Sequence, residues 1–333
     1  MSTLDENEGR GLPVVSVVMP VYQVSDYIDD AISSVLSQTF SDLELIIVDD
    51  GSTDGSGEKC DAWANSDSRI IVFHQNNAGQ SSARNLALSK AKGDYLLFVD
   101  SDDFLQPCLL EFALQRLQDT DSDICFFKYL ILKQNGKLEP YKESAIFPQD
   151  LLAAPKETLK YLMEQRIHHY PWARLAKRRL YVEGNEFFPV GRKMEDIATT
   201  ARLITRASAV SFLDKELYVY RMREGSTVFE WSHRLTFDTI KAIADIQVDI
   251  ELFDVDVRAS FLNYKIKMMF YCMMMECRLP DHKIVKEPYA LAKKEMQQAA
   301  ACARNKLTSA NKVRLILARL GLTNFVAIIR DGR

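Results

Sequence analysis

Four short apolar runs recur along the first hundred residues, and mostly polar segments separate them. The runs are VVSVVMP (14–20), LELIIV (43–48), IIVFH (70–74) and YLLFV (95–99). Each is almost continuously apolar rather than alternating, which is typical of strands that are covered on both faces. The pattern therefore predicts four strands of a buried sheet.

Between these runs the spacing of apolar residues becomes helical. Ile28, Ile32 and Val35 fall on one stripe, as in a helix that packs on a sheet. A second helical pattern runs over residues 81–92 and stops at Gly93, a residue suited to the C′ position beyond a helix. This alternation of strands and helices predicts an α/β fold with a doubly wound, mostly parallel sheet.

After about residue 232 the chain is predicted to be helical. One stripe follows helical spacing with a single polar break, over Phe237, Ile240, Ile243, Ala244, Gln247 and Ile250. The methionine-rich segment KIKMMFYCMMMECR (265–278) is predicted to be core rather than a binding surface.

The last segment, NKVRLILARLGLTNFVAIIR (311–330), mixes Leu and Ile with Arg and Lys. Residues 281–333 carry 11 Lys and Arg against 4 Asp and Glu, in a chain whose formal net charge is −4. Basic, leucine-rich helices of this kind are typical of segments that lie on anionic membranes. Packing against the rest of the chain, or against a second subunit in a homodimer, explains the pattern about as well, and a solvated helix face is the commoner explanation of the charge.

Composition narrows the class of protein. With 47% hydrophobic and 26% charged residues the chain reads as soluble and globular, and its charge gives no reason to expect nucleic acid. The six cysteines form no CxxC pair, and most lie in apolar runs, as buried thiols of a reducing compartment do. The acidic N-terminus is no signal peptide, and the run MMFYCMMM is too short to span a bilayer. We therefore expect a cytoplasmic protein, with peripheral contact to the inner face of the plasma membrane through its tail.

Polar and acidic segments follow three of the predicted strands, at the edge where open parallel sheets bind ligands. They are Pro20-Val21-Tyr22, Asp49-Asp50-Gly51-Ser52 and Asp100-Ser101-Asp102-Asp103. Asp and Ser also form turns and cap helices, which explains one such cluster well but three together poorly. The pattern predicts that five carboxylates converge on one crevice.

Three of those carboxylates, Asp100, Asp102 and Asp103, lie within four residues. So much negative charge is unfavourable unless cations offset it or water screens it. Carboxylate oxygens suit Mg²⁺ or Mn²⁺, and Mg²⁺ is typically held by one or two carboxylates plus substrate phosphates. The residues favour a cation that neutralises a diphosphate, with a solvated acidic turn as the alternative.

A calcium loop is a competing interpretation of IIVDDGSTDGSGEKCD (46–61), because residues from Asp50 nearly match an EF-hand. An EF-hand loop lies between two helices, whereas a buried strand precedes this one. Gly57 also occupies position 8, which is normally apolar, and the chain has no second copy. We therefore reject calcium sensing.

The blocks VSVVMPVYQVSDYIDDAISSVLSQTF, LIIVDDGSTDGS, NAGQSSARN and GDYLLFVDSDD, in this order and spacing, resemble family 2 glycosyltransferases with the GT-A fold. The resemblance covers residues 14–105 strongly. It continues more weakly to about Val228 through PWARL (171–175), MEDI (194–197) and YRMREGST (220–227).

The resemblance implies inverting transfer of a sugar from a nucleotide-diphosphate donor, usually UDP-linked, to an acceptor hydroxyl in glycan or polysaccharide synthesis. The implied nucleotide-sugar site comprises Pro20, Val21 and Tyr22 around the base, Asp49 and Asp50 at the base and ribose, Arg84 at the base or diphosphate, Asp100 and Ser101 at the ribose side, and Arg221 over the diphosphate. Asp102, together with Asp100, is the implied ligand of Mn²⁺ or Mg²⁺.

The resemblance also implies that Asp196 is the base that deprotonates the acceptor. An inverting displacement needs one base and no protein nucleophile. Its neighbour Glu195 is the alternative base, and an acidic first turn of a helix is the alternative to both. Trp172 and Arg174 match the family's positions near the acceptor, a glycan or lipid-linked glycan, although buried aromatics are more often core.

With these roles, the chain is predicted to have a flexible N-terminus (1–12), a GT-A catalytic domain (13–230) and a helical C-terminal extension (231–333). The catalytic domain would have a nucleotide-sugar-binding half (13–105) and an acceptor-binding half (106–230). The alternatives are a non-catalytic nucleotide-sugar-binding protein and a sugar nucleotidyltransferase. The latter needs a glycine-rich basic loop where this chain has PVYQVSDY.

Overall fold

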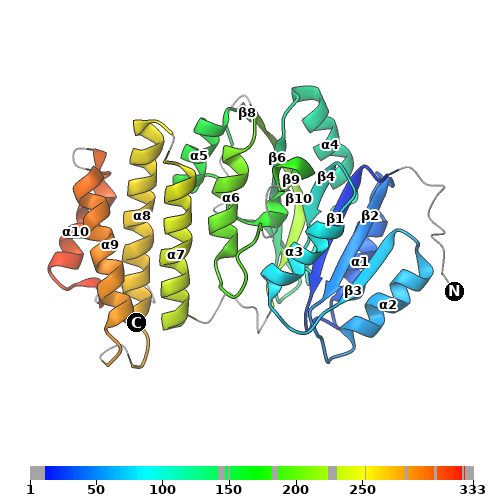
Figure 1. Ribbon diagram of the computed structural model, residues 1–333, viewed down its shortest axis with the longest axis horizontal. Coiled ribbons are helices and arrows are strands. Elements are labelled where there is room, and N and C mark those ends of the chain that lie inside the picture. The colour runs from blue at the N-terminus through cyan, green and yellow to red at the C-terminus, as the bar shows by residue number, and fades with distance from the viewer. Residues whose placement is uncertain are drawn as a thin grey trace. The chain divides into compact units, whose positions relative to one another are not determined.

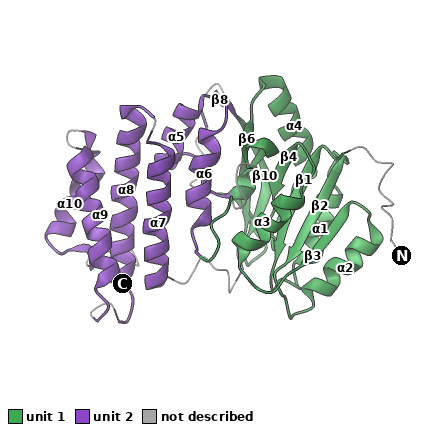
Figure 2. Cartoon of the chain, viewed as in Figure 1, with its two compact units in different colours: residues 1–141, 171–191, 211–221 green, residues 142–170, 192–210, 222–333 purple. Residues whose placement is uncertain are grey.

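A computed structural model describes residues 12–141, 147–148, 151–181, 187–223, 231–251, 253–281, 284–303, 306–324 and 326. The chain divides into two compact units (Figure 2). Unit 1 comprises Met1–Tyr141, Pro171–Gly191 and Ser211–Arg221, and unit 2 comprises Lys142–Tyr170, Arg192–Val210 and Met222–Arg333. The sequence-based division at residue 230 concerns function rather than contacts, and it stays a prediction.

The first half of the unit 1 sheet is parallel and confirms the four predicted strands. These strands are β1 (Val15–Val21), β2 (Leu43–Asp49), β3 (Ile70–His74) and β4 (Tyr95–Phe98). β1 lies between β2 and β4, and β3 lies beyond β2. All side chains of β1 and β2 are buried, as expected for strands with helices on both faces.

The second half of the sheet was not predicted and is largely antiparallel. It consists of β9 (Arg174–Lys177), β6 (Ile124–Leu132), β10 (Val210–Arg221) and β5 (Phe104–Leu105), with β7 (Leu138–Pro140) paired to β6. The strand order is β3-β2-β1-β4-β9-β6-β10-β5 (Figure 1). The pairs β4–β9, β9–β6 and β10–β5 are antiparallel. The predicted fold class, an α/β protein with a mostly parallel central sheet, is confirmed.

The helices of unit 1 cover the sheet. They are α1 (Ile28–Leu36), α2 (Ser56–Ser66), α3 (Gln80–Lys90) and α4 (Leu109–Thr120). α1 buries the predicted stripe, and α3 packs on β1 and β2. From β1 to β2 to β3 the chain moves across the sheet in one direction, and from β3 to β4 it returns past β1 to the other side. Right-handed crossovers therefore place α1 and α2 on one face and α3 on the other.

Gly93 has a different role from the one predicted. α3 ends at Lys90, and Ala91 is already extended, so Gly93 is not a left-handed helix cap. A Cβ at Gly93 would lie 2.5 Å from the backbone nitrogen of Ser16. The Gly93 N–H donates to the Ser16 hydroxyl, which donates to Glu44. Only glycine allows this close approach to β1.

Unit 2 is built from helices packed around α8. Its elements are β8 (Leu152–Ala153), α5 (Pro155–Met163), α6 (Glu195–Thr205), α7 (His233–Asp249), α8 (Val255–Glu276), α9 (Glu287–Ala303) and α10 (Ser309–Arg319). α8 contacts α5, α7, α9 and α10. Met269, Met273 and Met274 of α8 are buried, which confirms that the methionine-rich segment is core.

The stripe predicted on α7 was only partly right. Ile243 and Ile250 are buried, but Ala244 and Gln247 are exposed. The buried face follows Leu235, Ala242, Ile243 and Ile246. α7 packs against α6, α8 and α9, so its contact face is set by three partners rather than by one apolar stripe.

Two observations bear on the membrane and cysteine predictions. Among the described residues, no helix is long and apolar enough to cross a bilayer. Cys60, Cys125 and Cys272 are buried, whereas Cys302 is exposed. Burial raises the pKa of each of the three buried thiols to about 12, so these are packing residues.

Candidate active site

Side-chain hydrogen bonds tie the loop after β1 to the loop after β2. The Gln23 N–H donates to Ser52 Oγ at 3.2 Å, the Val24 N–H donates to Ser56 Oγ at 3.0 Å, and the Ser25 N–H donates to Asp54 Oδ2 at 2.9 Å. These contacts hold the ends of two parallel strands as one rim. They also explain the GSTDGS segment without calcium, since Ser56–Ser66 is helical and covers positions 7–12 of the EF-hand match.

Three residues of the predicted base pocket lie at this rim. Pro20 and Val21 are buried at the end of β1. Tyr22 follows them and is 48% exposed. Among the three, only Tyr22 presents a large side chain to the surroundings.

Asp50 fastens the loop after β3 to the end of β2. Its Oδ1 accepts the Ala78 N–H at 2.8 Å and the Gln75 side-chain amide at 2.6 Å, and its Oδ2 accepts the Gly79 N–H at 2.8 Å. This loop leads directly into α3, which carries Arg84. The carboxylate of Asp50 therefore sets where α3 begins.

Asp49 pairs with His74, a residue that sequence reasoning missed. Asp49 Oδ1 accepts the Ser52 N–H, and Oδ2 lies 3.0 Å from His74 Nδ1. His74 Nε2 lies 3.1 Å from Asp61 Oδ1. The hydrogen bond with Asp49 is the largest cause of a raised pKa for His74, and Asp61 adds to it. A Cβ at Gly57 would lie 2.9 Å from Asp49 Oδ2, so only glycine lets α2 approach this pair.

Arg84 and Asp100, both expected in the nucleotide-sugar site, form an ion pair with each other. Arg84 lies on α3 with 2% of its side chain exposed, and its Nη2 donates to Asp100 Oδ1 at 3.0 Å. The Gln80 side-chain amide donates to the same oxygen at 3.2 Å. The guanidinium also lies over the Phe188 ring, 5.4 Å from its centroid. A buried guanidinium is tolerable only with such a partner.

Asp103, the last carboxylate of the acidic turn, is fully buried. Its Oδ2 accepts the Tyr218 O–H and its Oδ1 accepts the Arg221 N–H, both at 2.7 Å. Burial raises the pKa of Asp103 well above its usual value, and the charges of Asp102 and Asp100 raise it further. Asp103 is therefore held by the chain itself. It does not join the ligand-facing crevice in which five carboxylates were expected.

Asp100 and Asp102 are the oxygen donors that could hold a cation. Asp102 is half-buried, and Asp100 is 23% exposed; Ser101 between them is buried. Within the described ranges, no three His, Cys, Asp or Glu side chains are grouped as a metal cage. The donor set fits Mg²⁺ or Mn²⁺ bound by one or two carboxylates and completed by phosphate and water.

Arg221 lies beside this turn at the end of β10. Its Nε donates to the Asp102 carbonyl oxygen at 2.9 Å, and its Nη2 forms an ion pair with Asp30 of α1 at 2.9 Å. The guanidinium also lies over the rings of Tyr27 and Phe104. These contacts place the positively charged guanidinium of Arg221 next to Asp102, where we predicted from the sequence that Arg221 binds the diphosphate.

Trp172 and Arg174, the predicted acceptor residues, lie in the core of unit 1. Trp172 is 4% exposed and stacks on Tyr218 with ring centroids 4.4 Å apart and an interplanar angle of 9°. Arg174 on β9 is fully buried and lies over the Phe126 ring. Packing, the alternative left open for Trp172, is what the structure shows, and acceptor contact stays a prediction for both residues.

Glu195 and Asp196 lie in the first turn of α6, in unit 2. Asp196 is half-buried, and its Oδ1 accepts the Ile197 N–H at 2.8 Å. α7 anchors the residues just before them, since the Lys193 N–H donates to Asp238 at 3.0 Å and Arg192 forms an ion pair with Asp245.

A buried tyrosine of α8, Tyr264, is influenced by the charge of Asp196. Burial raises its pKa, and the charge of Asp196 raises it further. Its hydroxyl lies 3.1 Å from His169 Nε2. No short motif links this pair, because α8 and the segment before η1 (Pro171–Ala173) are far apart along the chain.

Comparison with known proteins agrees with this fold. Residues 16–181 match the family model described as Glycosyl transferase family 2. Glycosyltransferase GlyG of Streptococcus pneumoniae serotype 4 is 34% identical over 243 residues, covering 70% of this chain and 80% of GlyG. The uncharacterized glycosyltransferase EpsJ of Bacillus subtilis is 36% identical over 220 residues, covering 65% of this chain and 63% of EpsJ.

Among solved structures, S. aureus TarS 1–349 in complex with UDP-GlcNAc is similar, with a TM-score of 0.71 and 23% identity over 96% of this chain and 92% of that one. At this identity the likeness establishes the fold. The family model, the curated relatives and the fold together define a glycosyltransferase of GT-A architecture. The chain belongs to glycosyltransferase family 2, which confirms the resemblance found in its sequence.

The His74 bridge predicts a pH-dependent stability. The folded-state pKa of His74 is raised, so its contribution is present below the unfolded-state pKa of about 6.5 and is lost as pH rises through the folded value. We expect the free energy of unfolding, from urea titrations between about pH 5.5 and 8.5, to fall less steeply in His74→Asn than in the wild type. Asp61→Asn, which removes only the second partner, should give an intermediate slope. Identical slopes in all three proteins would contradict the bridge.

Proposed function

We propose that this chain transfers a sugar from a UDP-sugar to the hydroxyl of a glycan or lipid-linked glycan, with inversion at the anomeric carbon. The observation that carries the proposal is the edge formed by the ends of β1, β2 and β4. There the exposed Tyr22 follows β1, Asp100 and the half-buried Asp102 follow the neighbouring strand β4, and Arg84 of α3 pairs with Asp100. A protein of the same fold, TarS, has been crystallised with UDP-GlcNAc, which supports a uridine donor.

The nucleotide would lie against the rim of the first two strands. Tyr22, with Pro20 and Val21 behind it, offers an aromatic surface to a base. A carboxylate has about four acceptor sites, and Asp50 uses three of them on its own chain. Asp49 and Asp50 are thus preorganised, with acceptor capacity left for the base or ribose.

The diphosphate would lie between Arg84 and Arg221, close to the acidic turn. Asp102, with Asp100, would hold Mn²⁺ or Mg²⁺. When bound, this cation would neutralise the charge that develops on the departing diphosphate. Arg221 is already fixed beside the Asp102 carbonyl, and arginine pairs well with phosphate oxygens.

Asp196 would take the proton of the acceptor hydroxyl. Its carboxylate lies at the positive N-terminal end of α6, and α7 fixes the segment that leads to it. Since the departing diphosphate is not protonated, one base is enough for the reaction. Glu195, one residue earlier in the same turn, is the alternative base.

We also propose that α10 lies on an anionic membrane surface. Val313, Ile316 and Leu320 recur at helical spacing and are 54%, 54% and 66% exposed. The exposed cations Lys312 and Arg319 flank this stripe. An apolar face edged with basic residues suits the interface of a bilayer with acidic headgroups.

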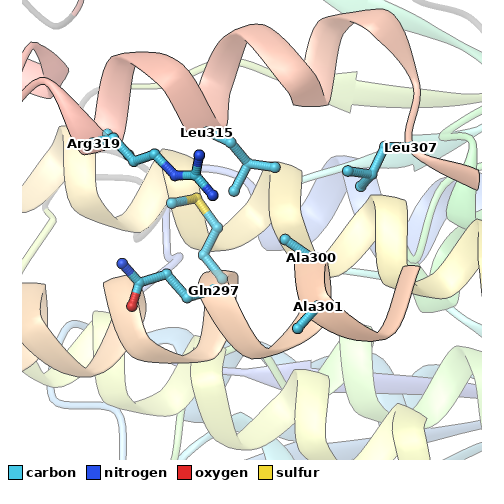
Figure 3. Close-up of a pocket in the computed structure, with 8 residues that line it drawn as sticks. Gln297, Ala300, Ala301, Leu307, Leu315 and Arg319 are labelled. Atoms are coloured by element: carbon cyan, nitrogen blue, oxygen red, sulfur yellow. The ribbon is translucent and has the colours of Figure 1, made fainter. Parts of the chain in front are cut away.

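A groove beside this stripe is consistent with binding to the same anionic membrane surface. It lies between α9 and α10 (Figure 3) and has a volume of about 330 Å³. Met296, Ala300 and Leu315 line it with apolar side chains, and Arg319 and Gln297 lie at one end. Residues 327–333, the end of the basic tail, lie outside the described residues.

Donor binding should depend on metal. UDP at about 100 times its dissociation constant should raise the free energy of unfolding by about 2.7 kcal/mol in the presence of Mn²⁺. We expect little effect in excess chelator, because Asp102 and the diphosphate would share the ion. Thermal unfolding with UDP, with and without chelator, measures this difference. Equal stabilisation in both conditions would remove the metal from the mechanism.

Asp196→Asn should abolish proton transfer while preserving side-chain size. We expect the transfer rate to fall roughly 10²–10⁴-fold, the usual contribution of a positioned base, with UDP affinity nearly unchanged. Glu195→Gln is the matched control and should be milder. Measuring sugar transfer and UDP binding in both variants separates the two acids. Near-normal transfer by Asp196→Asn would assign the base to Glu195 or reduce the pair to a helix cap.

The double variant Ile316→Gln, Leu320→Gln should bind anionic vesicles about tenfold or more weakly than the wild type, because two apolar side chains no longer enter the interface. Cosedimentation with phosphatidylglycerol vesicles at low and high salt measures binding, which salt should weaken. The control is Val248→Gln, since Val248 is 70% exposed on α7. Unchanged vesicle binding, or a dimer that only the double variant loses in sedimentation, would assign this face to a second subunit.

A further inference from the structure

The hydroxyl of Tyr218 bridges the two ends of the acidic turn. It accepts the Asp100 backbone N–H at 3.1 Å and donates to Asp103 Oδ2 at 2.7 Å. The turn is also closed on itself, because the Asp103 N–H donates to the Asp100 carbonyl at 3.0 Å. Ser101 and Asp102 therefore lie in a loop whose first and last residues are both fixed.

The opposite side of the turn is held by Arg221, three residues further along β10. Its backbone N–H donates to Asp103 Oδ1, and its Nε donates to the carbonyl oxygen of Asp102. Together with Tyr218, Arg221 thus holds the turn through the Asp100 N–H, the Asp102 carbonyl oxygen and the Asp103 carboxylate. The backbone on both sides of the Asp102 side chain is therefore fixed by β10.

Tyr218 is itself held firmly. It is fully buried, its ring stacks on Trp172, and it lies opposite Leu105 in the β10–β5 pair. Leu105 is two residues beyond Asp103, so the short β5 strand brings the turn against β10. A phenolic hydroxyl held in this way has little freedom to move away from Asp100 and Asp103.

Burying a carboxylate and a hydroxyl is unfavourable unless each finds hydrogen-bond partners. Apolar side chains would fill the same space without that cost. Here the Tyr218 hydroxyl finds its partners in Asp100 and Asp103, the two ends of the turn that contains Asp102. We propose that Tyr218 and Asp103 are positioning residues, which set the Asp100–Asp102 carboxylates for a divalent cation and diphosphate without touching either.

This inference rests on the proposed function, and one pair of variants tests it. Tyr218→Phe keeps the ring on Trp172 and removes only the bridging hydroxyl. Ser211→Ala is the matched control, because Ser211 is a buried hydroxyl on the same strand that accepts a hydrogen bond from Ser122 at 2.7 Å, away from the turn. Asp103→Asn tests the other end of the bridge.

Two readouts are needed. Amide hydrogen exchange of ligand-free protein should be faster over residues 99–104 in Tyr218→Phe but not in Ser211→Ala. Titration calorimetry with UDP in the presence of Mn²⁺ should show about 10–100-fold weaker binding in Tyr218→Phe, as for other groups that orient metal ligands. Asp103→Asn should show a similar loss, and the double variant should lose little more than either single one, because both act through one bridge.

Each outcome has a distinct meaning. Equal UDP affinity in Tyr218→Phe and Ser211→Ala would overturn the inference and leave the pair as core packing. Additive losses in the double variant would also overturn it, since two separate effects would then be at work. A wild type that binds no UDP with Mn²⁺ would overturn the proposed function itself, and the inference with it. If Tyr218→Phe does not fold, the comparison of Asp103→Asn with Ser211→Ala decides the question by the same criterion.

Discussion

Three carboxylates within four residues at the end of a buried strand impose the constraint on which this structure depends. Their repulsion in a poorly hydrated turn must be offset by donors from elsewhere in the chain. α3 supplies Arg84 to Asp100, and β10 supplies the Tyr218 hydroxyl and the Arg221 backbone to Asp103. Asp102 remains half-buried between these two fixed neighbours. The fold thus separates acids that hold the turn from the acid proposed to hold a cation, and the antiparallel half of the sheet is what makes this possible.

The sequence predicted the parts of the fold that local pattern encodes. Continuous apolar runs identified the four parallel strands, and helical spacing identified the buried face of α1. The family resemblance assigned Arg84 and Asp100 to one site, and the structure pairs them, while their contact with a nucleotide stays a prediction. The antiparallel strands were missed because their residues alternate less clearly and their pairing partners are distant in sequence. The buried face of α7 was partly misjudged because three neighbouring helices, rather than its own apolar stripe, determine it.

Two residues near the site were not predicted from the sequence, because their side-chain partners are distant along the chain. His74 and Tyr218 belong to no short motif, and their partners lie 25 and 115 residues away. Asp103 was expected in the crevice with the other carboxylates, yet it is fully buried and bonded within the chain. Trp172 and Arg174 match the family's positions near the acceptor and both lie in the core, so acceptor contact stays a prediction. The residue types indicated the chemistry, whereas burial is not directly visible in the sequence.

The central claim is that the ends of β1, β2 and β4 form a UDP-sugar site whose cation is held by Asp102. A crystal structure with UDP and Mn²⁺, with an anomalous difference map at the manganese edge, tests it most directly. The account predicts one manganese peak at the Asp102 carboxylate, with the diphosphate on its other side and the base beside Tyr22. A nucleotide bound elsewhere, or a manganese ion bound away from Asp100 and Asp102, would contradict it.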